Sequence, residues 1–101
     1  MRNRVDMICD ANNFAEAISM AGNRILEIYE SMAELYPVYQ ESLEEWKDTM
    51  FNLDIQRNYT YNDYGDLSDE ELDEKCKEYV GILKTLENKV EDLDKKLDKL
   101  G

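Results

Sequence analysis

The stretch that decides the fold is residues 69–100, which read DEELDEKCKEYVGILKTLENKVEDLDKKLDKL. Apolar side chains recur along it at alternating intervals of four and three residues. This spacing is a heptad pattern, which places one apolar row on a single face of a helix. We therefore expect one long amphipathic helix whose apolar row is buried against another helix.

Two packing partners are possible for this apolar row. With Cys76 at heptad position a, Lys89 falls at g and Asp94 at e. Lysine at g and acid at e suit parallel self-pairing, because g of one helix meets e of its partner. The alternative is packing against an earlier helix of the same chain, on the stripe from Ile18 to Met32. The predicted self-association seam comprises Leu72, Tyr79, Leu83, Leu86, Val90, Leu93, Leu97 and Leu100.

A clear start signal precedes this helix. Ser68 and Glu71 have the spacing of a capping box, and Leu67 and Leu72 have the spacing of a hydrophobic staple. Upstream, the helical period is lost and Asn, Asp, Gly and Tyr dominate. We predict a loop over residues 54–67 and a helix over residues 68–100.

A second heptad pattern occupies the first part of the chain, from Met7 to Tyr39. It predicts a helix over about residues 10–36, with Asn12 or Asn13 as its N-cap. Pro37 interrupts the pattern, because proline lacks a backbone donor and disfavours helical geometry in the residue before it. Either the helix kinks there and continues over about residues 37–53, or it ends and a second helix folds back.

The fold class that follows is all-α. We expect a single helical domain over residues 1–101, as a helical hairpin or a three-helix arrangement that forms a coiled-coil dimer or a higher homo-oligomer. The composition agrees, with 43% hydrophobic residues but only four Gly and one Pro. No apolar run approaches the roughly 20 residues that span a bilayer, and the N-terminus lacks a signal peptide's apolar run. The expected localisation is the cytoplasm, and the host cytoplasm for a phage-encoded protein.

The residue types argue against catalysis and cofactor binding. The chain has no histidine, which is the commonest general base and a frequent zinc ligand. Cys9 and Cys76 lie too far apart in sequence to form a metal or redox motif. Residues 58–66 offer oxygen ligands, but Asp63 stands where a calcium loop requires glycine. We expect no enzyme activity, no metal and no cofactor.

The net charge of −12 is concentrated in the middle of the chain. Residues 27–56 hold eight acids and one base, and residues 57–78 hold eight acids and three bases, whereas both ends are neutral. Direct binding to nucleic acid needs a basic face, so we do not expect it. A helical rod with an acidic side resembles nucleic acid in its electric field and suits a basic groove on a protein partner.

Two groups of residues are predicted to contact that partner. The predicted acidic face comprises Glu27, Glu30, Glu34, Glu41, Glu44, Glu45 and Asp48. The predicted recognition loop comprises Tyr59, Tyr61, Asp63, Tyr64 and Asp66. Exposed tyrosines offer rigid amphipathic contact area. The open alternative is that these tyrosines fold back over the helices.

The length, helicity and central Trp46 of the chain resemble the small helical-hairpin substrates of Gram-positive secretion systems. Those proteins carry Trp-x-Gly in their turn, whereas Trp46 is followed by Lys47 and Asp48 within a helical period. The resemblance covers only length and helicity, so it assigns no family.

The function predicted from sequence is stoichiometric binding to a protein. Small acidic inhibitors of phages and mobile elements have this character, and here the target would be a basic, nucleic-acid-binding surface. One alternative is a structural coiled-coil adaptor or scaffold, for which the acidic face is incidental. Another is a small-ligand sponge formed between protomers, with Arg2, Arg4 and Arg24 available to bind phosphate.

Overall fold

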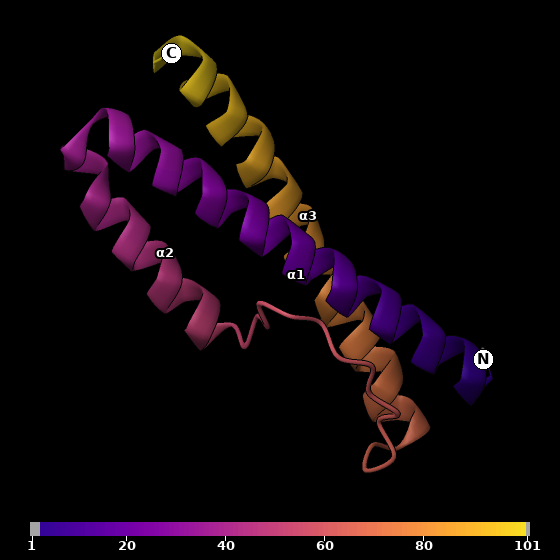
Figure 1. The fold of residues 1–101 in the computed structure, drawn as a ribbon. Coiled ribbons are helices and arrows are strands. Elements are labelled where there is room, and N and C mark those ends of the chain that lie inside the picture. Colours follow the sequence, from indigo (N-terminus) through magenta and orange to yellow (C-terminus); the bar gives the residue numbers. More distant parts are fainter. Residues whose placement is uncertain (1–2, 101) are drawn as a thin grey trace.

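The computed structural model describes residues 3–100, and over that range the chain is all-helical, with no strand. The three α-helices are α1 (Arg4–Leu35), α2 (Gln40–Asn52) and α3 (Asp69–Leu100), and a 3-10 turn at Pro37–Tyr39 joins α1 to α2. α1 packs against both other helices, with α3 along its length and α2 folded back on its C-terminal half (Figure 1).

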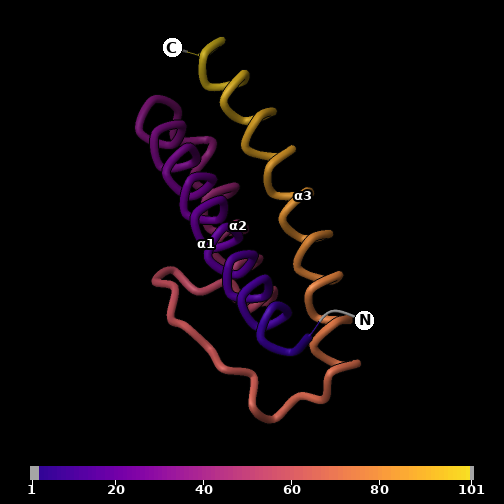
Figure 2. The backbone as a smooth tube through the Cα atoms, turned by 90° about the vertical axis from the view of Figure 1, so that its right-hand side faces the viewer, coloured from indigo at the N-terminus to yellow at the C-terminus, as the bar shows by residue number. Residues whose placement is uncertain are grey.

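α1 and α3 run in the same direction. Their first turns are joined by Arg4 and Asp69, whose Nη1 and Oδ1 atoms lie 2.8 Å apart. Further along, the Nη2 atom of Arg24 lies 2.8 Å from Oδ1 of Asp94. The view turned by 90° also shows the two helices extending side by side from the N-terminal end (Figure 2). The pair is therefore parallel.

The apolar row of α3 is buried within the chain. Leu86 and Leu93 share a core cluster with Ile25 and Ile28 of α1. Leu72 belongs to a second cluster, near the start of both helices. Of the two predicted partners for the row, the structure shows the earlier helix. The other seam residues are half-buried around these clusters: Tyr79, Leu83, Val90, Leu97 and Leu100.

The charged flanks of the row also make contacts inside the chain. Asp94 pairs with Arg24 of α1. Lys89 places its ammonium nitrogen 5.4 Å from the centre of the Trp46 ring, within the range of a cation–π contact. The lysine and the acid that suggested parallel self-pairing are thus engaged in tertiary contacts. The electrostatic argument for that self-paired seam does not hold.

α1 begins at Arg4, so the expected start near residue 10 is wrong. Asn3 is the N-cap, and its side-chain oxygen accepts a hydrogen bond from the Asp6 amide at 2.9 Å. Asn12, one of the two expected caps, is buried inside the helix, and Asn13 is exposed there. Asparagine favours helix starts because of its local hydrogen bonds. At Asn12 the same side chain serves a long-range contact, which local spacing does not reveal.

The chain reverses at Pro37, which decides between the two alternatives left open by the sequence. Tyr36 is extended, with ψ of 106°, as expected for the residue before a proline. α2 then returns antiparallel to α1 (Figure 1). Trp46 of α2 donates its indole N–H to the carbonyl oxygen of Gly22 in α1 at 3.1 Å. The two helices form a hairpin and not one kinked helix.

The predicted start of α3 is confirmed. The Ser68 amide donates to Oε1 of Glu71 at 3.1 Å, and the Glu71 amide donates to Oγ of Ser68 at 3.2 Å. These two hydrogen bonds form the capping box. The pKa of the Glu71 carboxyl is lowered, because hydrogen bonds from the Ser68 backbone amide and then from the Ser68 side chain favour the charged carboxylate. The irregular segment over residues 53–68 matches the predicted loop to within one residue at each end.

Two glycines inside helices provide a matched test of this packing. A Cβ at Gly22 would lie 3.0 Å from Cγ2 of Ile55 and 3.3 Å from Cε of Met50, whereas a Cβ at Gly81 would meet nothing within 4 Å. We expect Gly81→Ala to raise the free energy of unfolding by about 0.5–1 kcal/mol, through helix propensity alone. We expect Gly22→Ala to lower it, because overpacking costs about 1–3 kcal/mol and the same gain in helix propensity offsets only part of that cost. Urea denaturation followed by circular dichroism measures both, and a stabilised Gly22→Ala variant would contradict the close packing of α1 on Ile55.

Candidate interaction surface

Part of the predicted acidic face forms a stripe along α2. The spacing of its members is i, i+3, i+4 and i+7, which places them on one side of a helix. The other side of α2 is buried through Leu43, Trp46 and Met50. The stripe therefore points away from the core, and all four of its members are exposed: Glu41, Glu44, Glu45 and Asp48.

Little positive charge balances this stripe. Lys47 is the one base in α2, and its ammonium nitrogen lies 3.3 Å from Oε1 of Glu44. Both side chains are about half exposed, so water weakens their interaction. Among residues 3–100, Glu41, Glu45 and Asp48 have no ion-pair partner. The outer side of α2 thus carries negative charge that the described residues largely leave unpaired.

α1 contributes the other predicted acids. Glu27, Glu30 and Glu34 are exposed in its last turns, before the chain reverses. One of them, Glu27, lies 3.8 Å from Nη1 of Arg24. Because α1 and α2 are antiparallel neighbours, the hairpin brings all seven predicted acids to the same end of the molecule. We call these seven residues the acidic hairpin.

The predicted recognition loop is largely an internal element. Tyr64 is only 4% exposed and packs with Met7 and Leu72 in the second core cluster. Its burial, together with the hydroxyl of Tyr79, raises the pKa of Tyr64 above its ordinary value. Tyr59 is half-buried, and its hydroxyl donates to Oδ1 of Asn12 at 2.6 Å. Tyr64 is therefore buried rather than exposed, as in the alternative that the tyrosines fold back over the helices, and the contact of Tyr59 with a partner stays a prediction.

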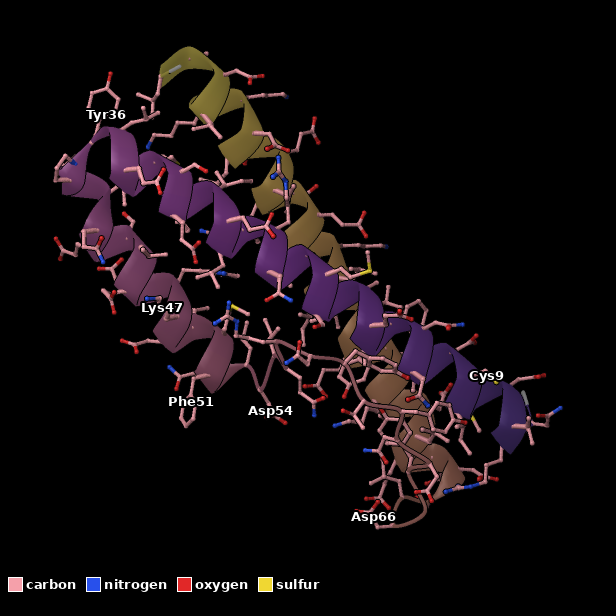
Figure 3. All side chains as sticks on the ribbon, in the orientation of Figure 1. Cys9, Tyr36, Lys47, Phe51, Asp54 and Asp66 are labelled. Carbon is pink, nitrogen blue, oxygen red and sulfur yellow. The ribbon has the colours of Figure 1, made fainter. Side chains whose placement is uncertain are left out.

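The remaining members of the recognition loop are exposed. The side chain of Tyr61 is 63% exposed. Asp63 accepts a hydrogen bond from the Gly65 amide at 3.0 Å, which fixes a local turn. Asp66 lies near the start of α3, far along the molecule from Lys47 and Phe51 on α2 (Figure 3). The structure therefore separates these loop residues from the acidic hairpin.

Polar residues of α1 hold the loop in place. The Nδ2 atom of Asn12 donates to the Asn62 carbonyl at 2.7 Å, and Oδ1 of Asn12 accepts from the Asn62 amide at 2.8 Å. The hydroxyl of Ser19 donates to the Gln56 carbonyl, and Asn23 donates to the Arg57 carbonyl at 2.7 Å. Sequence reasoning missed these anchors. Asn12, Ser19 and Asn23 lie at i, i+7 and i+11, so they share one face of the helix, and this spacing of polar residues was the signal that could have predicted them.

Arg4 holds the far end of the loop. Its Nη2 atom donates to the Tyr64 carbonyl at 2.7 Å and to the Leu67 carbonyl at 2.8 Å, while Nη1 pairs with Asp69. Arg4 and Arg24 are thus engaged in internal contacts, which weakens the sponge alternative that needs them for phosphate. Arg2, the third arginine of that alternative, lies outside the described residues.

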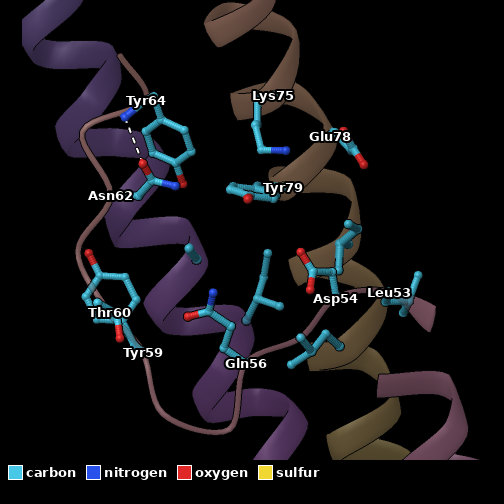
Figure 4. A pocket seen from close by; sticks show the side chains of 14 residues that line it. Leu53, Asp54, Gln56, Tyr59, Thr60, Asn62, Tyr64, Lys75, Glu78 and Tyr79 are labelled. Carbon is cyan, nitrogen blue, oxygen red and sulfur yellow. Dashed lines mark hydrogen bonds between the residues drawn. The ribbon is translucent and has the colours of Figure 1, made fainter. Parts of the chain in front are cut away.

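A small pocket of about 240 Å³ lies between the loop, α1 and α3. Figure 4 shows Tyr59 and Tyr64 on the loop side and Tyr79 on the α3 side. Lys75 also lines it, with its ammonium nitrogen 5.2 Å from the centre of the Tyr79 ring. The volume is below the roughly 300–1,000 Å³ of typical ligand sites. No motif in the sequence predicted this pocket.

No helix among the described residues is long and apolar enough to cross a membrane. Within residues 3–100 there is also no group of three or more His, Cys, Asp or Glu side chains placed to hold a metal ion. Comparison with protein-family models, curated proteins and solved structures finds no match for this chain.

The Asn12 anchor can be tested with its neighbour as control. Asn12→Ala leaves the Tyr59 hydroxyl and both backbone groups of Asn62 without their partner. We expect it to lower the free energy of unfolding by about 1–3 kcal/mol and to speed hydrogen exchange of the Asn62 amide. Asn13→Ala changes an exposed asparagine on the same helix and should have little effect. Equal effects of the two substitutions would contradict the anchor.

The raised pKa of Tyr64 predicts a dependence of stability on alkaline pH. The folded chain favours the neutral phenol, so the stabilisation is complete below the unfolded pKa of about 10 and is lost as pH rises above it. We expect the free energy of unfolding of the wild type to fall more steeply above that pH than that of Tyr64→Phe. Urea denaturation across the alkaline range measures the difference, and parallel profiles would contradict it.

Proposed function

We propose that this protein binds a protein partner stoichiometrically and occupies its basic, nucleic-acid-binding groove with the acidic hairpin. The observation that carries the proposal is the stripe on α2, which is exposed, lies opposite the buried face and has almost no neutralising partner. A row of carboxylates on a rigid helix offers a basic groove the charge that it normally binds on nucleic acid.

The distribution of lysines supports this proposal. Lys89 lies over the Trp46 ring, and Lys96 lies 5.1 Å from the centre of the Tyr39 ring. These lysines of α3 therefore face the inner side of the hairpin, where aromatic rings attract them. The outer side of α2 keeps its negative charge. Electrostatic attraction of this kind speeds association and selects basic partners.

An assembly role is a second candidate, favoured by apolar side chains at the tip of the hairpin. Leu35, Tyr36 and Val38 are all exposed there. Exposed apolar groups gathered on a small protein often mark contact with another protein. A homo-oligomer, with a dimer as the simplest form, would bury them without using the acidic stripe. Light scattering on the purified chain measures its oligomeric state.

The main proposal is tested by reversing charge at matched sites. Glu41→Lys, Glu44→Lys and Glu45→Lys together should abolish salt-sensitive retention of basic proteins from host lysate, because three contacts become repulsive. Helicity by circular dichroism should not change, since all three residues are exposed.

The control is an equal reversal on α3. Glu87, Asp92 and Asp98 are exposed and lie outside the acidic hairpin, so their replacement by lysine gives the same net charge. The control should retain the partner. If both triple variants lose binding equally, net charge and not the hairpin is responsible; if neither loses it, the proposed surface is wrong.

A further inference from the structure

Phe51 is the most exposed large apolar side chain among the described residues, at 85%. It lies in the last turn of α2, where its ring projects away from the rest of the molecule (Figure 3). Glu44, Asp48 and Phe51 follow one another at i, i+4 and i+7, so the ring continues the acidic stripe along one side of the helix. An aromatic group therefore ends a row of carboxylates.

The fold does not account for this ring. Met50 provides the buried contact of the last turn, and the helix ends through backbone hydrogen bonds from Leu53 to Thr49 and from Asp54 to Phe51. The Phe51 side chain belongs to neither core cluster. An exposed phenyl ring forgoes the free energy that burial would give. A partner that covers the ring would recover it.

The chemistry of the stripe favours one kind of groove. Grooves that hold single-stranded nucleic acid combine basic side chains for the phosphates with aromatic side chains on which bases stack. A duplex keeps its bases stacked inside, so proteins that read it meet phosphates and base edges and not free ring faces. The stripe offers carboxylates together with one free ring face. It therefore matches a single strand better than a duplex.

Resting on the function proposed above, we propose that the partner is a single-strand nucleic-acid-binding protein, with Phe51 in a base-stacking position and the α2 carboxylates in phosphate positions. The stripe from Glu41 to Phe51 spans ten residue steps, or about 15 Å of helix. Its neighbouring carboxylates stand about 5–6 Å apart at their Cβ atoms. A stripe of this length fits within a groove that holds about 4–16 nucleotides.

The test is competition for a purified single-strand DNA-binding protein of the OB-fold class, with fluorescent oligothymidine as the probe. The wild type should displace the oligothymidine. Phe51→Ala should weaken displacement by about tenfold, the scale of one lost base–aromatic stack. Phe51→Trp should restore it, whereas Phe51→Leu should not, because leucine is apolar but cannot stack. The salt dependence should be the same for all variants at Phe51, since none changes charge.

A matched control and a second target complete the design. Met20→Ala truncates another apolar side chain, 67% exposed on α1 and outside the stripe, and should displace like the wild type. The second target is a helix-turn-helix protein bound to labelled duplex DNA. Phe51→Ala and the wild type should displace this duplex to the same extent. Circular dichroism verifies that each variant is folded.

The outcomes separate this inference from the proposed function. If the Glu41, Glu44 and Glu45 reversals abolish displacement while Phe51→Ala does not weaken it, the groove is occupied by charge alone and the stacking inference is wrong. If Phe51→Leu equals the wild type, the ring enters an apolar pocket and does not stack. If the wild type displaces duplex DNA but not oligothymidine, the proposed function holds and this inference is wrong. If it displaces neither, both are wrong.

Discussion

The parallel packing of α1 on α3 is the constraint on which the rest of the structure depends. Each helix has 32 residues and is therefore about 48 Å long. Since the two helices run in the same direction, the chain must travel back along nearly that whole length between them. α2 has 13 residues and covers only about 20 Å of the return. The irregular segment over residues 53–68 covers the remainder, about 28 Å, where the helical period of the sequence is lost.

The same constraint makes the loop part of the core. Where α2 ends, the loop takes its place against α1 and α3, and Tyr64 fills the position that a helical side chain would otherwise occupy. An extended backbone has no internal hydrogen bonds, and its buried groups need partners. Asn12, Ser19 and Asn23 supply them from one face of α1. Tyr59 and Tyr64 therefore stabilise the fold, whereas Tyr61 stays exposed.

The same packing places basic side chains between the helices and leaves acidic side chains of α2 on the outside. Lys89 and Lys96 extend from α3 toward the aromatic rings on the inner side of the hairpin. Arg4 and Arg24 join α1 to α3. These bases are used in holding the three helices together, whereas the outer acids of α2 have almost no partners. The outer side of α2 therefore keeps an excess of negative charge, with the exposed ring of Phe51 at its edge.

Local sequence determined the periodic parts of this protein. The heptad row of α3 and the capping box at Ser68 depend on residues at most a few turns apart, so they could be predicted, as could the exposure of the seven acids. The partner of the row, the reversal at Pro37 and the burial of Tyr64 were decided by the tertiary structure. Each depends on which distant segments of the chain meet. By spacing alone, an apolar row fits another copy of the chain or another helix equally well. Asn12 could cap a helix or anchor a loop, and the position of the loop decides which.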